Sequence, residues 1–221
     1  MDIPAHLISG TTLWVGYVLF ALVMLAALLT APWFKIRDSG ALNVFLGAVV
    51  ILMLLWTMRA GIQPGLNFHL LGATALTLMF GWQFAWFAIT LIVTGTTLNG
   101  NAGWDALPLN VLLMGGLPIL VSNTLLYLAQ RFLPHNYFIY IFLNSFIAAG
   151  LSSLTVALAA YTLYRYNGVY PAQILNSQYL PFMLLVALPE STLNGITMTG
   201  TVVYKPEWVA TFHDRWYLYN K

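Results

Sequence analysis

The chain has 221 residues, of which 60% are hydrophobic and only 6% are charged, and its mean hydropathy is +0.81. Because a soluble domain carries about 25% charged residues, this composition excludes a water-exposed surface and predicts an integral membrane protein. The net charge of +2 argues against nucleic-acid binding, and the lack of cysteine excludes disulfides, iron–sulfur clusters and thiolate metal sites.

Stretches without Asp, Glu, Lys or Arg predict an all-α bundle of about seven transmembrane helices. A spanning helix needs ~20 apolar residues, and the charge-free stretch 60–104 has room for two that turn near Gly81 and Trp82. The predicted spans are 10–32, 41–60, 68–81, 83–96, 107–131, 136–164 and 178–203. Short loops and the lack of a repeat predict a single membrane domain over residues 1–221, with a tail at about 204–221.

The basic residues predict the orientation of this bundle. Most of them fall on one face, which the positive-inside rule assigns to the cytoplasm, and only Arg59 and Arg165 fall on the other. We therefore expect the N-terminus outside and the C-terminal tail in the cytoplasm. The basic residues assigned to the cytoplasm are Lys35, Arg37, Arg131, Lys205, Arg215 and Lys221.

The first predicted span begins just after a polar N-terminal stretch. Asp2 and His6 precede it, with no lysine or arginine among them. Because the basic start of a signal peptide is missing, we interpret the first span as a retained helix. At its inner end Ala27 and Ala31 form a small-xxx-small pair, which lets another helix of this chain or of a partner approach closely.

The third predicted span carries the first candidate ligand at membrane depth. His69 stands at its outer start, on the face where the N-terminus is expected. The Met1 amine, the Asp2 carboxylate and the His6 imidazole could converge on it to hold a divalent transition metal. The alternative is that His69 only forms a hydrogen bond with a neighbouring helix.

Two later spans contain further polar residues. Asn110 is followed by "LMGGLP", which interrupts the fifth span, so this region either packs closely or lines a cavity. In the last span Glu190 follows Pro189, and Asn194 lies one turn later. Glu190 either lines a polar cavity or is held neutral in a structural hydrogen bond.

Catalytic motifs are missing from the sequence. No Gly-Lys pair occurs, so there is no P-loop and the chain cannot hydrolyse ATP by itself. The serines have no histidine and acid placed beside them in a nucleophilic arrangement. We therefore expect a transport subunit rather than an enzyme.

These motifs resemble those of the substrate-binding membrane subunits of cobalt/nickel energy-coupling-factor (ECF) transporters. Members of that family typically begin Met-His-Ile-Pro-Asp-Gly, where this chain reads "MDIPAH", and their H-P-x-G-x-x-L-G-A-I-L-F-G-P is similar to "HLLGATALTLMFGW". Their N-x-x-x-M-G is similar to "NVLLMG", their L-P-x-x-x-x-E-G to "LPESTLNG", and their R-P-E to "KPE". The resemblance runs from residue 1 to about residue 208.

The resemblance implies a metal site at the N-terminus. In the family the terminal amine, the backbone nitrogen and imidazole of the second residue, and the motif histidine hold the ion. Met1 and His69 keep these places, whereas Asp2 replaces the histidine and His6 follows four residues later. An oxygen ligand in place of nitrogen favours a different divalent ion, so nickel, cobalt, zinc, iron and manganese all stay open.

The resemblance also implies a function. We expect a permease subunit of the bacterial inner (plasma) membrane that captures a divalent metal ion outside and releases it inward past Asn110, Glu190 and Asn194, the last replacing the family's late glutamate. A membrane coupling subunit and ATPase subunits would drive this step, with Ala27 and Ala31 as the docking face. The alternatives are a membrane metalloenzyme or metal-binding accessory subunit that kept the fold, and an organic substrate, because other ECF substrate subunits bind vitamins.

Overall fold

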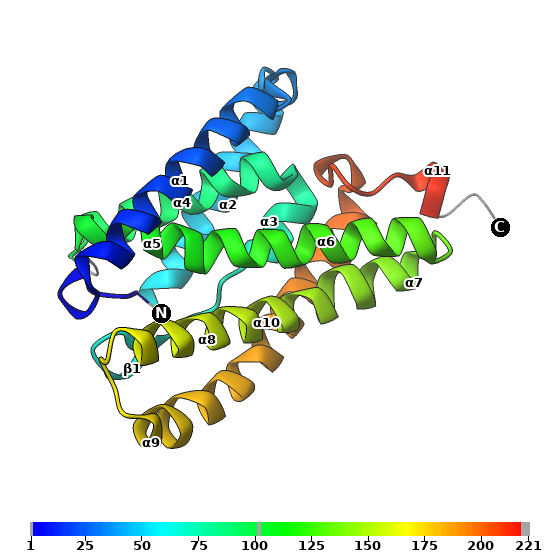
Figure 1. Ribbon diagram of the computed structural model, residues 1–221. Helices are drawn as coiled ribbons and strands as arrows, with labels where there is room; N and C mark the ends of the chain where they lie inside the picture. Colours follow the sequence, from blue (N-terminus) through cyan, green and yellow to red (C-terminus); the bar gives the residue numbers. More distant parts are fainter. Residues whose placement is uncertain (1, 101–102, 218–221) are drawn as a thin grey trace.

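The computed structural model of the protein describes residues 2–100 and 103–217. The first half of the chain contains four helices and one short hairpin (Figure 1). α4 is the central helix, because it packs against α1, α2, α3, α5 and α6. The elements are α1 (Gly10–Thr30), α2 (Ser39–Thr57), β1 (Ala60–Gln63), β2 (Leu66–Phe68), α3 (Ala73–Phe80) and α4 (Trp82–Leu98).

The second half of the chain folds into three long helical runs, each with a π-helical segment. π-helical turns widen a helix locally and are frequent at functional sites. The first run joins α5 (Leu107–Val111) to α6 (Leu117–Phe132) through the π-helical segment Leu112–Gly116. The second joins α7 (Tyr137–Ile139) to α8 (Ala148–Tyr166) through Tyr140–Ile147. The third joins α9 (Ala172–Ile174) to α10 (Leu180–Tyr204) through Leu175–Tyr179. A short α11 (Asp214–Tyr217) closes the described chain.

The fold confirms a mainly helical membrane protein. Within the described residues four helices are long and apolar enough to cross a membrane, namely Gly10–Thr30, Ser39–Thr57, Trp104–Phe132 and Tyr137–Tyr166. The predicted turn between the third and fourth spans is confirmed at Gly81, which separates α3 from α4. The number of seven spans and the orientation of the termini stay predictions.

The predicted third span, 68–81, is wrong in its first half. Residues 69–72 are not helical, and α3 begins only at Ala73. Gly72 has a φ of +65°, in the left-handed region, and so ends the non-helical segment with a sharp turn into α3. With 8 residues, α3 is about 12 Å long, which is less than half of a ~30 Å hydrocarbon core.

The hairpin β1–β2 was not anticipated by the predicted spans. Ala60 pairs with Phe68 and Gly61 with Asn67, and a bulge follows Gly61. Two tyrosine hydroxyls form hydrogen bonds with the turn of the hairpin. Tyr164 of α8 donates to the Gly65 carbonyl, and Tyr170, in the connection after α8, donates to the Pro64 carbonyl, each over 2.7 Å. The hairpin therefore has a fixed position beside α8.

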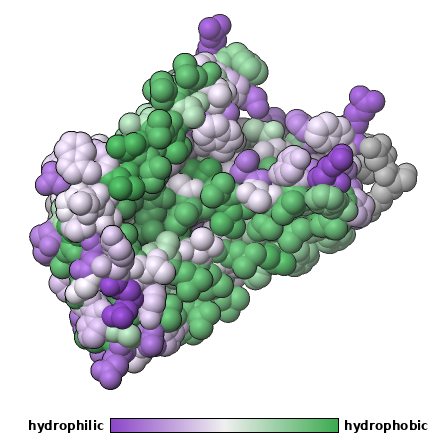
Figure 2. All heavy atoms as spheres, viewed as in Figure 1, coloured by the Kyte–Doolittle hydropathy of each residue, from purple (hydrophilic) through white to green (hydrophobic). Residues whose placement is uncertain are grey.

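The surface agrees with a membrane environment. Figure 2 shows hydrophobic residues over the sides of the long helices and polar residues gathered at the two ends of the bundle. Exposed apolar side chains on α1 include Leu22, Leu25 and Leu29. The hairpin and α11 lie at opposite ends of the bundle (Figure 1).

Candidate functional site

The N-terminal segment is held inside the bundle by Asn110. The Ile3 amide donates to Asn110 Oδ1 over 2.9 Å, and Asn110 Nδ2 donates to the Ile3 carbonyl over 3.1 Å. Both residues are fully buried. The side-chain amide of Asn110 thus pairs with the backbone of Ile3 as a neighbouring strand would. Its Oδ1 and its Nδ2 are both engaged in hydrogen bonds with Ile3.

Asp2 joins the same segment to the hairpin. Its amide donates to Asn67 Oδ1 over 2.8 Å, and its Oδ2 accepts from Asn67 Nδ2 over 3.2 Å. The same oxygen forms an ion pair with Arg59 Nη1 at 3.1 Å. Because Asp2 is only 5% exposed, these donors replace the water that its carboxylate loses.

His69 follows the hairpin and presents an unused nitrogen in the interior. Its ring lies against the Trp56 indole with 4.4 Å between centroids, and its Nδ1 is 3.2 Å from the Leu70 carbonyl oxygen. A carbonyl can only accept, so the proton belongs on Nδ1 and Nε2 keeps a lone pair. Nε2 is buried and has no hydrogen-bond partner in the described chain. A neutral imidazole with a free Nε2 is the form that binds metal ions.

The connection that carries His69 is supported by α10. Glu190 accepts hydrogen bonds from the Leu71 and Gly72 amides at 2.7 and 2.8 Å, and Asn194 accepts from the Ala75 amide at 2.8 Å. The Leu71 and Gly72 amides lie in the connection just before α3, and the Ala75 amide is one of the first N–H groups of α3, which have no partner within the helix. Non-helical backbone at membrane depth needs such internal partners, because lipid supplies none.

Glu190 and Asn194 also bind one another. Asn194 Nδ2 donates to Glu190 Oε1 over 2.9 Å and to the Glu190 carbonyl over 2.8 Å. Both residues are buried, at 1% and 0% exposure. The structural hydrogen bonds of the second interpretation of Glu190 are therefore present, whereas a role on a transport path stays a prediction. The carboxylate acts as an acceptor that closes the end of a neighbouring helix.

The predicted metal ligands are only partly brought together. Asp2 and His69 are both buried, and Asp2 is hydrogen-bonded to Asn67 of β2, the strand that directly precedes His69. His6, in contrast, is exposed in the short 3₁₀ turn Ala5–Leu7. In residues 2–100 and 103–217 no three His, Asp or Glu side chains gather as a metal cluster. Met1 lies outside the described residues.

The small-residue pair of α1 is used inside the chain. Ala27 is fully buried and Ala31 is 9% exposed. Next to them, the Thr30 carbonyl accepts a hydrogen bond from Gln83 of α4 over 3.2 Å. The close approach that Ala27 and Ala31 permit is therefore made by this chain's own helices, and docking of a partner on them stays a prediction.

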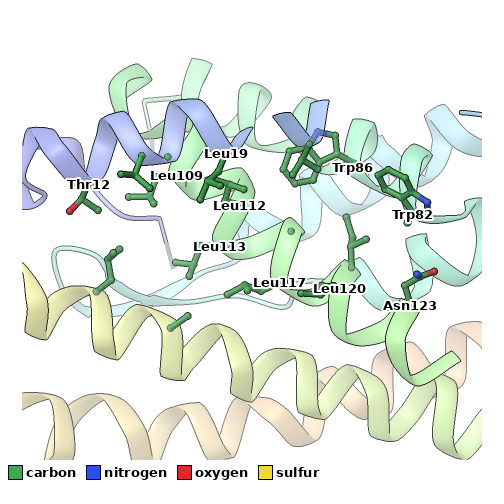
Figure 3. A pocket seen from close by; sticks show the side chains of 17 residues that line it. Thr12, Leu19, Trp82, Trp86, Leu109, Leu112, Leu113, Leu117, Leu120 and Asn123 are labelled. Atoms are coloured by element: carbon green, nitrogen blue, oxygen red, sulfur yellow. The ribbon is translucent and has the colours of Figure 1, made fainter. Parts of the chain in front are cut away.

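A separate apolar groove opens between α1 and the α5–α6 run (Figure 3). Its volume is about 580 Å³, and none of the predicted ligands lines it. Leucines from both sides and Trp82 and Trp86 of α4 form its wall; the labelled leucines are Leu19, Leu109, Leu112, Leu113, Leu117 and Leu120. Thr12 and Asn123 add two polar side chains at the ends of this wall (Figure 3), which otherwise suits an acyl chain or an apolar helix and has no charged or imidazole ligand for a metal ion.

Three residues near His69 were missed as part of the site: Trp56, Arg59 and Asn67. Arg59 had a signal, because it is one of only two basic residues on the predicted outer face and an acid stands at the N-terminus. For Trp56 and Asn67 the sequence contains no signal that points to the site. An aromatic residue at a helix end and an asparagine in a connection are both common in membrane proteins.

Comparison with known families gives one match. The model of the family described as cobalt uptake substrate-specific transmembrane region matches residues 2–208. No curated protein and no solved structure matches the chain.

Proposed function

The chain belongs to the family of cobalt uptake substrate-specific transmembrane regions, the cobalt/nickel substrate-binding subunits of ECF transporters, and we propose that it binds a divalent transition-metal ion for passage across the plasma membrane. The observation that carries the proposal is the buried Nε2 of His69, which has no hydrogen-bond partner among the residues that the structure describes. A buried polar atom without a partner is costly, so an atom of this kind calls for an explanation such as an absent ligand. Imidazole nitrogen suits cobalt, nickel, zinc and iron.

We assign the ligands as follows. His69 Nε2 is the central ligand, and the Met1 amine and the Asp2 carboxylate complete the site. His6 is exposed, so it reaches the ion only if the Ala5–Leu7 turn rearranges. The ion is the transported substrate. It is released inward when its contacts with His69, Met1 and Asp2 are lost.

We propose that Asn110, Glu190 and Asn194 form the framework of the inward path. Their polar atoms are engaged with Ile3 and with the start of α3. An ion that leaves His69 toward the cytoplasm passes α3, so α3 must shift against α10 and exchange these hydrogen bonds. Because the chain has no P-loop, this shift needs an external ATPase and a membrane coupling subunit.

The proposal is tested by equilibrium dialysis of the detergent-purified chain against Co²⁺, Ni²⁺, Zn²⁺ and Fe²⁺, followed by elemental analysis. The wild-type protein is expected to retain one metal ion per chain. His69→Ala is expected to weaken binding at least about tenfold, because it removes the central ligand. The control His135→Ala changes an exposed histidine at the other end of the bundle and should bind like wild type. Wild-type protein that binds none of the four ions contradicts the proposal.

A further inference from the structure

The ion pair between Asp2 and Arg59 places the positive charge of the guanidinium beside a proposed ligand of the metal ion. The Asp2 side chain is 6% exposed and the Arg59 side chain 31% exposed, with 3.1 Å between Oδ2 and Nη1. Asn67 supplies the same carboxylate with a neutral donor only. Within residues 2–100 and 103–217, Arg59 is therefore the cation that balances the buried negative charge when no metal ion is bound.

Arg59 and a metal ion compete for the same carboxylate. The proposed site shares the ion between Asp2 and His69, which are both buried, and the Arg59 guanidinium lies 3.1 Å from Asp2 Oδ2, so an ion bound to this carboxylate lies close to both charges. The ion is attracted by Asp2 and repelled by Arg59, and neither effect is fully screened at a buried site. Binding becomes favourable when the guanidinium moves away and leaves Asp2 to the ion.

We propose that Arg59 is a tethered counter-cation of Asp2 that the incoming divalent metal ion displaces, and that this exchange sets the affinity and charge selectivity of the site. The inference rests on the proposed function. A monovalent ion that replaced Arg59 would bring no more charge to Asp2 than the guanidinium does, whereas a divalent ion doubles it. The partial exposure of Arg59 gives its long side chain a way out toward solvent.

The first test compares the Co²⁺ affinity of wild type, Arg59→Gln and Arg59→Lys by equilibrium dialysis. Arg59→Gln should bind Co²⁺ about three- to tenfold more tightly, because the competing charge is gone. Arg59→Lys keeps the charge and should bind more weakly than Arg59→Gln. The matched control is Arg165→Gln, which removes an exposed basic residue at the end of α8 and should leave the affinity unchanged. An unchanged or weaker affinity in Arg59→Gln overturns the inference.

A second test needs no variant. Phenylglyoxal modifies arginine, and mass spectrometry reports the modified fraction at each site of the wild-type protein. Saturating Co²⁺ should raise the modification rate of Arg59 by at least about threefold and leave that of Arg165 unchanged, since ion-pairing protects only Arg59. A rate at Arg59 that stays constant or falls overturns the displacement.

The two proposals fail in different ways. If the wild-type protein binds no Co²⁺, the proposed function fails and the inference fails with it. If it binds Co²⁺ through His69 while both Arg59 experiments give the negative result, only the inference fails. Trp56 is one of eight tryptophans and lies against the His69 ring, so a change in tryptophan fluorescence that is missing in His69→Ala is an independent signal of metal binding at this position.

Discussion

At the scale of single residues, the site is organised by polar side chains that serve backbone groups. The side chain of Asn110 accepts a hydrogen bond from the Ile3 amide, and that of Asn67 accepts one from the Asp2 amide. The Glu190 carboxylate accepts one from the Leu71 amide, in the connection after His69. The hydrogen bonds of Asn110 and Glu190 are buried and that of Asn67 is partly buried, so a lost partner leaves a group with little access to water unpaired. His69 Nε2 is the exception among these groups, since it remains unpaired.

The role of Asn110 gives a prediction about stability. Asn110→Ala leaves the buried N–H and C=O of Ile3 without partners and should lower the free energy of unfolding by about 2–4 kcal/mol, which detergent unfolding curves measure. The matched control Asn123→Ala removes an exposed asparagine of α6 and should change it by less than about 0.5 kcal/mol. Equal stability of the two variants would show that the pairing with Ile3 contributes nothing.

At the scale of elements, α3 depends on α10 for its start. An 8-residue helix is too short to be stable alone, and its first N–H groups point at Glu190 and Asn194. The same contacts fix the connection that carries His69. A change in the α3–α10 contact therefore reaches the proposed metal ligand directly, which links the framework of the path to the site.

Hydrogen exchange measures this dependence. Glu190→Ala removes the acceptor of the Leu71 and Gly72 amides, at a cost of about 1–3 kcal/mol for each buried donor. Exchange of amides in residues 71–76 should accelerate at least about tenfold, whereas amides of α8 should keep their rates. The control Glu207→Ala removes an exposed carboxylate and should alter neither region. Unchanged exchange rates of residues 71–76 in Glu190→Ala would mean that the start of α3 does not depend on the hydrogen bonds to Glu190.

At the scale of the whole molecule, the sequence predicts the helices well and their contacts poorly. Apolar runs reveal membrane helices because the bilayer fixes their length, and Gly81 and the polar residues His69, Asn110 and Glu190 stand out against them. The Glu190–Gly72 contact joins residues 118 positions apart, which no local pattern reveals. For the same reason the helical prediction for residues 68–72 failed. Its apolar composition fits a helix, and the distant acceptor on α10 explains how a non-helical backbone is tolerated there.

The orientation of the bundle has a direct test, because the chain contains no cysteine. Gln173 lies at an exposed position of α9, just after the connection from α8, and His135 lies at an exposed position between α6 and α7, so each can be replaced by cysteine. A membrane-impermeant maleimide should label Gln173→Cys in intact cells and His135→Cys only after permeabilisation, as the positive-inside rule predicts. The reverse labelling would place the N-terminus in the cytoplasm.

The central claim is that the metal ion binds to His69, and X-ray absorption spectroscopy of the Co²⁺-loaded protein tests it most directly. The account predicts a shell of nitrogen and oxygen ligands at about 2.0–2.2 Å together with the outer-shell scattering of an imidazole ring. That imidazole signal should vanish in His69→Ala, even at Co²⁺ concentrations that restore binding. A stoichiometric cobalt ion without imidazole scattering in the wild-type protein would contradict the account.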